Sequence, residues 1–207
     1  MDGKLLKDPM LSSNPVTILA LGICSALAVT GQMMPSMTMG IAVTVVIVVS
    51  STVVSAIKNY IPARVSIICQ MTVIATLVIL VDQVLKAYQY ETSKQLSVFV
   101  GLIITNCIVM GRTEGFAMGN KPGASMLDGL GNGLAYAIIL IIISFVRELF
   151  GSGTLFGAKM IPQSFYDAGY VDNGLLVLPP AAFFILGFII WAQKEWMGRK
   201  DPSVFEE

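Results

Sequence analysis

Two long apolar runs, residues 41–57 and 134–150, constrain this chain more than any other feature of its sequence. The hydrocarbon core of a bilayer is about 30 Å thick and needs roughly 20 apolar helical residues to cross it, so each run predicts a full membrane span. Charged residues make up only 13% of the chain, against about 25% in soluble domains. The sequence therefore predicts an all-α integral membrane protein.

Glycine, proline and charged residues divide the rest of the chain into four further apolar segments. The six predicted spans are residues 15–30, 38–57, 65–86, 96–110, 129–149 and 175–196. The first has features of a signal peptide, but five apolar segments follow it, so we expect it to be retained. The first and fourth are the shortest and are expected to be short or broken helices within one membrane domain, residues 1–207.

Composition excludes several classes of function. The 13 basic residues balance 13 acidic ones, so no basic excess would attract nucleic acid. The absence of histidine excludes bis-His haem, the usual catalytic zinc sites and Ser-His-Asp chemistry. Three cysteines inside apolar segments are too few for a disulfide framework.

The basic residues are unevenly divided between the two faces that six spans would create. The face that carries both termini would hold nine of them: Lys4, Lys7, Lys58, Arg64, Arg112, Lys121, Lys194, Arg199 and Lys200. The opposite face would hold the other four: Lys86, Lys94, Arg147 and Lys159. This bias predicts that both termini lie in the cytoplasm.

The two halves of the chain share a pattern at the ends of the second and fifth spans. Residues 55–61 and 144–150 align at an offset of 89, with small, basic and bulky positions in step. Because three spans per half is an odd number, the second half must enter the membrane from the opposite side. We therefore expect two inverted three-helix repeats, about 15–90 and 96–196, although the third and sixth spans show no such match.

Cys24 and Cys107 lie in the first span of each predicted repeat. Counted from Pro15 and Leu96, they lie nine and eleven residues in, or roughly 14 and 17 Å at 1.5 Å per residue. Both would reach the middle of the bilayer. Short or interrupted spans at corresponding positions of two repeats are the best sequence indication of a binding site at that depth. Packing as a small apolar group is the alternative for each cysteine and the preferred interpretation for Cys69. A functional interpretation requires a soft metal, and an iron–sulfur cluster takes four cysteines, so a second subunit of similar build would supply two.

Several stretches of the chain resemble one known family. Residues 21–30 (LGICSALAVT), 103–112 (IITNCIVMGR) and 114–117 (EGFA) are similar to the paired membrane subunits of the sodium-translocating NADH:quinone reductase and the related Rnf complex. Three further stretches resemble the D branch of that family: residues 81–88, 93–102 and 128–133.

The resemblance implies a subunit of an inner-membrane enzyme complex, with no independent catalytic activity. Electrons would pass from NADH through flavins and iron–sulfur centres, held partly in other subunits, to ubiquinone while sodium is expelled. Cys24 and Cys107 would be the two ligands from this chain to an iron–sulfur cluster, expected as the 2Fe–2S type. The cluster would be shared with the paralogous E subunit, and the A, B, C and F subunits would complete the complex. An Rnf-type subunit is the nearest alternative, and an ion carrier or a scaffold without a redox role are others.

Sodium movement would need oxygen ligands, and four acidic residues lie in or beside the predicted spans. Asp82 and Asp128, on opposite faces, are the candidates for a sodium pathway. Their simpler explanations are an i,i+4 pair of Asp82 with Lys86 and a helix-start role for Asp128. Glu148 is expected to be solvated or paired at an interface, and Glu114 to lie in a loop.

Overall fold

The computed structural model describes residues 16, 21–88, 101–155, 158–159, 174 and 178–198. This part is helical apart from an antiparallel pair of two-residue strands, β1 (Thr154–Leu155) and β2 (Ala158–Lys159). The α-helices are α2 (Ile23–Val29), α3 (Met33–Ile57), α4 (Ser66–Tyr88), α6 (Cys107–Arg112), α7 (Pro122–Ser152) and α10 (Pro179–Gly198). A π-helical turn over Thr113–Ala117 extends α6.

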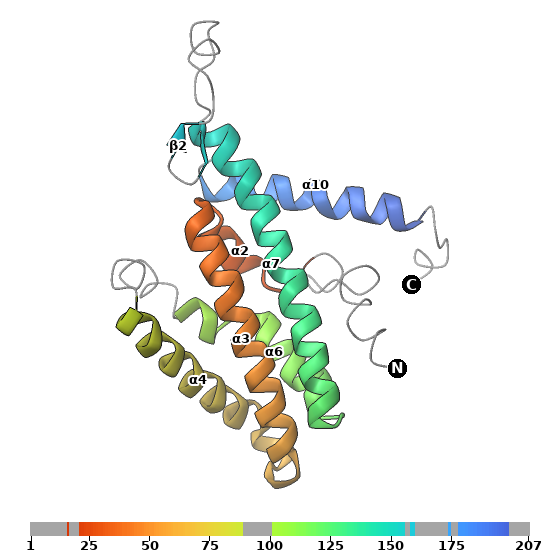
Figure 1. Ribbon diagram of the computed structural model, residues 1–207. Helices are drawn as coiled ribbons and strands as arrows, with labels where there is room; N and C mark the ends of the chain where they lie inside the picture. The colour runs from red at the N-terminus through yellow and green to blue at the C-terminus, as the bar shows by residue number, and fades with distance from the viewer. Residues whose placement is uncertain are drawn as a thin grey trace, which may run out of the picture.

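The long helices α3 and α7 form the centre of the molecule and run side by side in opposite directions (Figure 1). Glycines make this close approach possible. A Cβ atom at Gly133 would lie 2.9 Å from the Cα of Thr44, and one at Gly129 would lie 3.2 Å from the Cα of Val48. The segment of α7 around Gly129 and Gly133 therefore packs directly against the backbone of α3.

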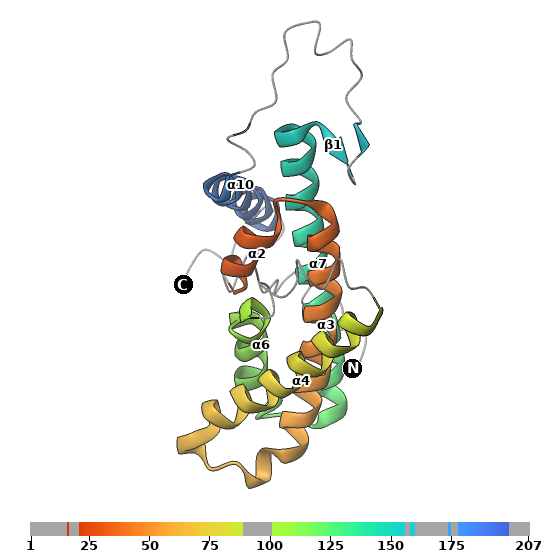
Figure 2. The same cartoon turned by 90° about the vertical axis from the view of Figure 1, so that its left-hand side faces the viewer.

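The half-helices α2 and α6 lie one above the other beside this central pair (Figure 2). Their first residues face each other, because the backbone N–H of Gly22, at the start of α2, reaches the side chain of Cys107, the first residue of α6. From that meeting point α2 leads to the start of α3, whereas α6 leads toward the start of α7 at the other end of the molecule. The two half-helices therefore run in opposite directions.

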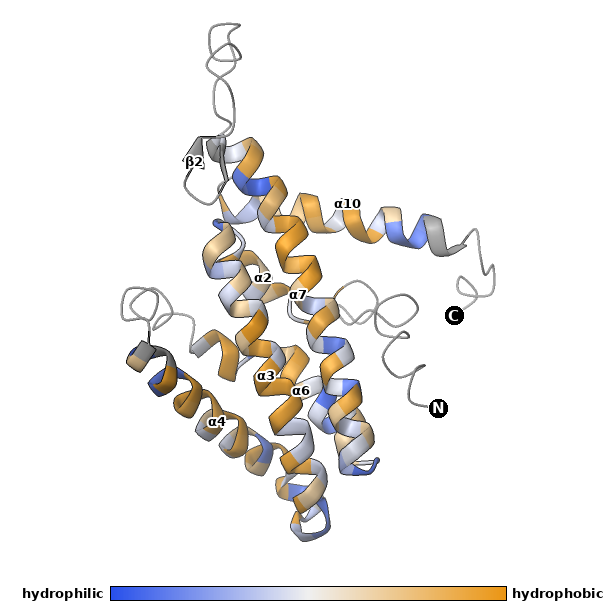
Figure 3. Ribbon diagram, viewed as in Figure 1, coloured by the Kyte–Doolittle hydropathy of each residue, from blue (hydrophilic) through white to orange (hydrophobic). Residues whose placement is uncertain are grey.

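Among the described residues, three helices are long and apolar enough to cross a membrane: Met33–Tyr60, Ser66–Val84 and Pro122–Gly151. They correspond to the second, third and fifth predicted spans, so a multi-pass helical membrane fold is confirmed. Large apolar side chains are exposed along α3 and α7, including Ile41 and Leu134, and Figure 3 shows that hydrophobic residues recur along the long helices. Such surfaces suit contact with lipid or with a partner.

Three predicted boundaries are wrong. The second helix begins at Met33 rather than at residue 38. The fifth helix begins at Pro122 rather than at residue 129, because proline suits the first helical position. The fourth segment does not end at residue 110: it breaks at Thr105 and Asn106, restarts at Cys107 and continues as helix to Ala117.

Candidate functional site

Cys107 and the residues before Cys24 meet where the two half-helices begin. The N–H of Gly22 donates a hydrogen bond to Sγ of Cys107 at 2.8 Å, although the two residues lie 85 positions apart in the chain. Cys24 is the second residue of α2 and is exposed, while Cys107 is partly exposed. Neither cysteine forms a disulfide. The fold thus brings the two predicted ligand segments together at one place inside the helical body.

Glycine is required at position 22 for two reasons. Its φ of 82° lies in the left-handed region that side chains disfavour. A Cβ atom there would also lie 3.0 Å from Cε2 of Tyr136. Any larger residue would push the start of α2 away from the tyrosine ring and from Cys107.

A cluster of three buried polar side chains lies directly behind the cysteines. Ser25 follows Cys24, Asn106 precedes Cys107, and Tyr136 comes from the middle of α7. Asn106 Nδ2 donates to Ser25 Oγ at 3.1 Å, and the Tyr136 hydroxyl lies 2.6 Å from the same oxygen. Ser25 Oγ in turn donates to the carbonyl of Gly22 at 3.0 Å, so Tyr136 is the donor in its own pair with Ser25. We call these three residues the central clasp.

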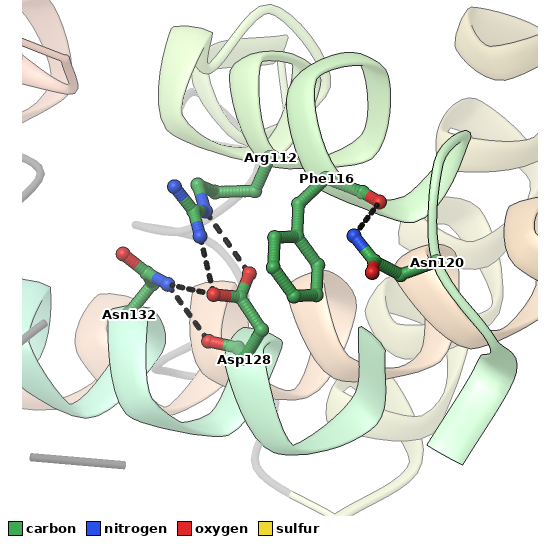
Figure 4. A network of polar contacts seen from close by, with 5 residues as sticks. All are labelled: Arg112, Phe116, Asn120, Asp128 and Asn132. Atoms are coloured by element: carbon green, nitrogen blue, oxygen red, sulfur yellow. Dashed lines mark hydrogen bonds and ion pairs between the residues drawn. The ribbon is translucent and has the colours of Figure 1, made fainter. Parts of the chain in front are cut away.

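Asp128 lies in the interior of α7 rather than at its start. It is buried and pairs with Arg112: Nε of the arginine lies 3.0 Å from one carboxylate oxygen and Nη2 contacts the other (Figure 4). Asn132 Nδ2 donates to the backbone and side-chain oxygens of Asp128, and the Arg112 guanidinium lies 5.4 Å from the Phe116 ring centre. The helix-start interpretation of Asp128 is therefore wrong, and the charge of Arg112 is paired with this carboxylate.

The other acidic candidates have different environments. Asp82 pairs with Lys86 at 2.5 Å, as the i,i+4 spacing predicts. Glu114 lies in the π-helical turn rather than in a loop, where it accepts hydrogen bonds from Ser66 at 3.2 Å and from Gln70. The structure therefore contradicts the expected loop.

Arg147 and Glu148 are buried near the end of α7 rather than solvated at an interface. Glu148 accepts the N–H of Met33 at 2.6 Å and so satisfies a free donor at the first turn of α3. Arg147 donates to Thr30 Oγ1 at 2.6 Å and to the carbonyl of Leu178 at 3.2 Å. Both side chains join helix ends, which explains why charged residues are tolerated in the interior of the protein.

Sequence reasoning missed Tyr136 as a residue of this site. The available signal was a single aromatic hydroxyl within an apolar span, because a buried tyrosine needs a hydrogen-bond partner. Within the described ranges, His, Cys, Asp and Glu residues form no group of three or more that could hold a metal. Any metal bound by Cys24 and Cys107 would therefore need further ligands from outside these ranges.

Long apolar helices around two half-helices that meet inside the fold define a class of protein: a polytopic membrane protein with a site at the helix breaks. The sequence profile of the Rnf-Nqr subunit family of membrane proteins matches residues 3–190, and the chain belongs to this family. The family resemblance seen in the sequence is thereby confirmed.

The chain is similar to several proteins named as the D subunit of Na(+)-translocating NADH-quinone reductase. It is 56% identical to the one from Aeromonas hydrophila over 203 residues, which is 98% of this chain and 95% of the relative. It is 57% identical to that of Haemophilus ducreyi over 194 residues, covering 93% of each protein. It is 54% identical to that of Pseudomonas aeruginosa strain LESB58 over 193 residues, covering 93% of this chain and 86% of the relative.

Proposed function

We propose that this chain is a membrane subunit of a sodium-translocating NADH:quinone reductase and that Cys24 and Cys107 supply half of the ligands of an intramembrane iron–sulfur cluster. The family and the near full-length similarity to D subunits of that enzyme support the first part. The single observation that carries the second part is the hydrogen bond from Gly22 to Sγ of Cys107, because it brings together the segments of both cysteines.

The residues of this chain fit an iron–sulfur cluster. Thiolate is the ligand that iron–sulfur clusters use, and an N–H donor to a ligating sulfur is a typical partner in these sites. Cys24 is exposed on the surface of the chain, so its sulfur is accessible to a group shared with another subunit. Four cysteines are the usual set, and two from this chain leave two for a paralogous partner, which we propose is the E subunit. When bound, the cluster would supply one-electron transfer within the membrane.

The rest of the chain holds these two cysteines in place. The tightly packed pair of α3 and α7 provides a rigid support, and the side chain of Tyr136 on α7 contacts the half-helix segments. Apolar residues around the half-helices, such as Val29, Ile103 and Ile108, are buried and exclude water from the interior behind the cysteines. A subunit with this design positions an electron carrier and has no active site of its own.

We also propose the finer topology: six spans as two inverted repeats, residues 15–90 and 96–196, in the bacterial inner membrane with both termini in the cytoplasm. Two sets of contacts, each between a long helix of one repeat and the half-helix segment of the other, support this topology. Lys58, at the end of α3, donates to the carbonyl of Asn120 beyond the second half-helix at 2.7 Å. Arg147, at the position equivalent to Lys58, contacts the carbonyl of Leu27 and the side chain of Thr30 at the end of the first half-helix.

Sodium transport is a further part of the proposal. Asp82 and Asp128 are the candidate carboxylates, and each is paired with a basic residue, Lys86 or Arg112. A sodium ion that enters either site would compete with that basic residue for the carboxylate. The remaining partners, the A, B, C and F subunits, would hold the flavins and the NADH site.

The experiment that tests this function uses the assembled complex with Cys24→Ala or Cys107→Ala. We expect quinone reduction by NADH to be lost, while NADH oxidation by an artificial acceptor, which needs only the partner subunits, is retained. Cys69→Ala is the matched control and should keep both activities. Full quinone reduction in a chain that lacks both Cys24 and Cys107 would contradict the proposal.

A further inference from the structure

The central clasp joins the two residues that flank the cysteines to one scaffold helix. Ser25 is covalently next to Cys24, Asn106 is covalently next to Cys107, and their side chains are hydrogen-bonded to each other at 3.1 Å. Tyr136 donates to the same Ser25 oxygen from α7. We propose that Tyr136 is a positioning residue that fixes the relative placement of Cys24 and Cys107, and thereby how firmly they retain a shared metal centre. This inference rests on the proposed function.

The clasp is buried from solvent and fully hydrogen-bonded. Ser25, Asn106 and Tyr136 are 2%, 3% and 0% exposed. Each polar atom of Ser25 is used, because its oxygen accepts from Asn106 and Tyr136 and its hydrogen is directed to the Gly22 carbonyl. Asn106 also accepts the N–H of Ile108 at 3.3 Å, which caps the start of α6. Networks in which every member is satisfied hold their members in one arrangement.

The same network reaches the sulfur of Cys107. Ser25 holds the carbonyl of Gly22, and the N–H of Gly22 donates to Cys107 Sγ at 2.8 Å. Loss of the tyrosine hydroxyl would leave Ser25 with one donor fewer, so Ser25 would hold the Gly22 segment less firmly. Hydrogen bonds to ligating sulfurs contribute to the reduction potential of a cluster. The clasp therefore connects a residue on α7 to both the geometry and the electronic environment of the two thiolates.

Tyr136→Phe tests this connection, because it removes the hydroxyl and keeps the aromatic ring. The ring edge faces Gly22, where a Cβ would lie 3.0 Å from Cε2, and phenylalanine keeps that ring in place. The substitution removes the hydroxyl and with it the 2.6 Å contact with Ser25. Tyr60, which is 88% exposed, offers a matched control, since Tyr60→Phe removes the same atom where it contacts no clasp residue.

The test measures iron release from the purified complex into a ferrous-iron chelator. The relevant quantity is the iron that Cys24→Ala removes, so that iron held elsewhere in the complex does not enter the comparison. We expect Tyr136→Phe and Ser25→Ala each to release this iron about tenfold faster than the unaltered complex, as removal of an outer-shell partner does at other metal sites. The double variant should release it no faster than Ser25→Ala alone, because Ser25→Ala already removes the contact that Tyr136→Phe breaks. Tyr60→Phe should behave as the unaltered complex.

A redox titration of the signal that Cys24→Ala abolishes provides a second readout. We expect its midpoint potential to become more negative in Tyr136→Phe, because a weakened N–H donor to Cys107 Sγ stabilises the reduced state less. A general loss of stability would not move this potential.

The outcomes distinguish a failure of the proposed function from a failure of the positioning role of Tyr136. If Cys24→Ala keeps all of the iron, the proposed function is wrong. If Cys24→Ala removes iron but Tyr136→Phe releases it at the unaltered rate and potential, the positioning role is wrong and the proposed function stands. If Tyr136→Phe yields too little assembled complex, Ser25→Ala, which removes a single buried hydroxyl, decides the question by the same criteria.

Discussion

The packing of α3 against α7 makes a sharp prediction for Gly133→Ala. The new Cβ would lie 2.8 Å from Cγ2, 2.9 Å from Oγ1 and 2.9 Å from the Cα of Thr44. Carbon atoms in favourable contact are about 3.5–4.0 Å apart, so the two helices must separate by roughly 0.6–1 Å at this point. The backbone Cα cannot turn aside, and the Thr44 hydroxyl is held by the Gly40 carbonyl at 2.7 Å.

A gap of this size forfeits about a quarter to a half of the dispersion energy of the affected contacts. Overpacking of this kind typically costs about 1–3 kcal/mol, and the better helix propensity of alanine returns at most about 1 kcal/mol. With the full 1 kcal/mol returned, the net loss is up to about 2 kcal/mol. Gly123→Ala, in the first turn of the same helix, meets no atom within 4 Å and should be neutral or stabilising.

The assay is the temperature at which the detergent-solubilised complex loses this subunit, followed by size-exclusion chromatography. About 1.4 kcal/mol corresponds to a tenfold change in an equilibrium constant, so Gly133→Ala should dissociate at a clearly lower temperature than the unaltered complex. Gly123→Ala should not. Equal midpoints for both variants would refute the reasoning that close helix approach requires glycine at position 133.

Three further predictions concern the charged residues and the orientation. Arg147→Met should destabilise the subunit by about 1–3 kcal/mol in the same thermal assay, because its buried acceptors lose a charged donor; an unchanged midpoint would show that these bonds contribute nothing. Asp128→Asn should raise the sodium concentration that gives half-maximal quinone reduction, because a neutral amide binds the cation less well than a carboxylate; an unaltered sodium dependence would remove Asp128 from the pathway. Gln32→Cys should react with a membrane-impermeant maleimide in intact cells and Asn59→Cys only after permeabilisation, since the two exposed positions lie at opposite ends of α3; the reverse pattern would invert the orientation.

The sequence contained enough information for the helical class and for the interruption of the two cysteine segments. Apolar runs of this length leave few alternatives to membrane helices, because unsatisfied backbone groups are costly in lipid. The Asp82–Lys86 pair was also predictable, since its partners are neighbours on one helix.

Contacts between distant segments were not predictable in the same way. The stretch from Asp128 to Gly133 is rich in glycine, which disfavours a helix, but Gly129 and Gly133 are what allow α7 to pack on α3. Arg147 and Glu148 resemble interfacial charges in the sequence because their partners, Thr30 and Met33, lie more than 110 residues earlier in the chain. Tyr136 could be recognised as part of the site only once the fold placed it beside Ser25.

The central claim is that Cys24 and Cys107 bind iron together with a partner subunit. Its most direct test is the content of iron and acid-labile sulfide per complex in Cys24→Ala, Cys107→Ala and the control Cys69→Ala. We predict that the first two lose the same amount of iron and sulfide, that the double variant loses no more than either, and that the control matches the unaltered complex. Unaltered iron and sulfide in the variant that lacks both Cys24 and Cys107 would contradict the account.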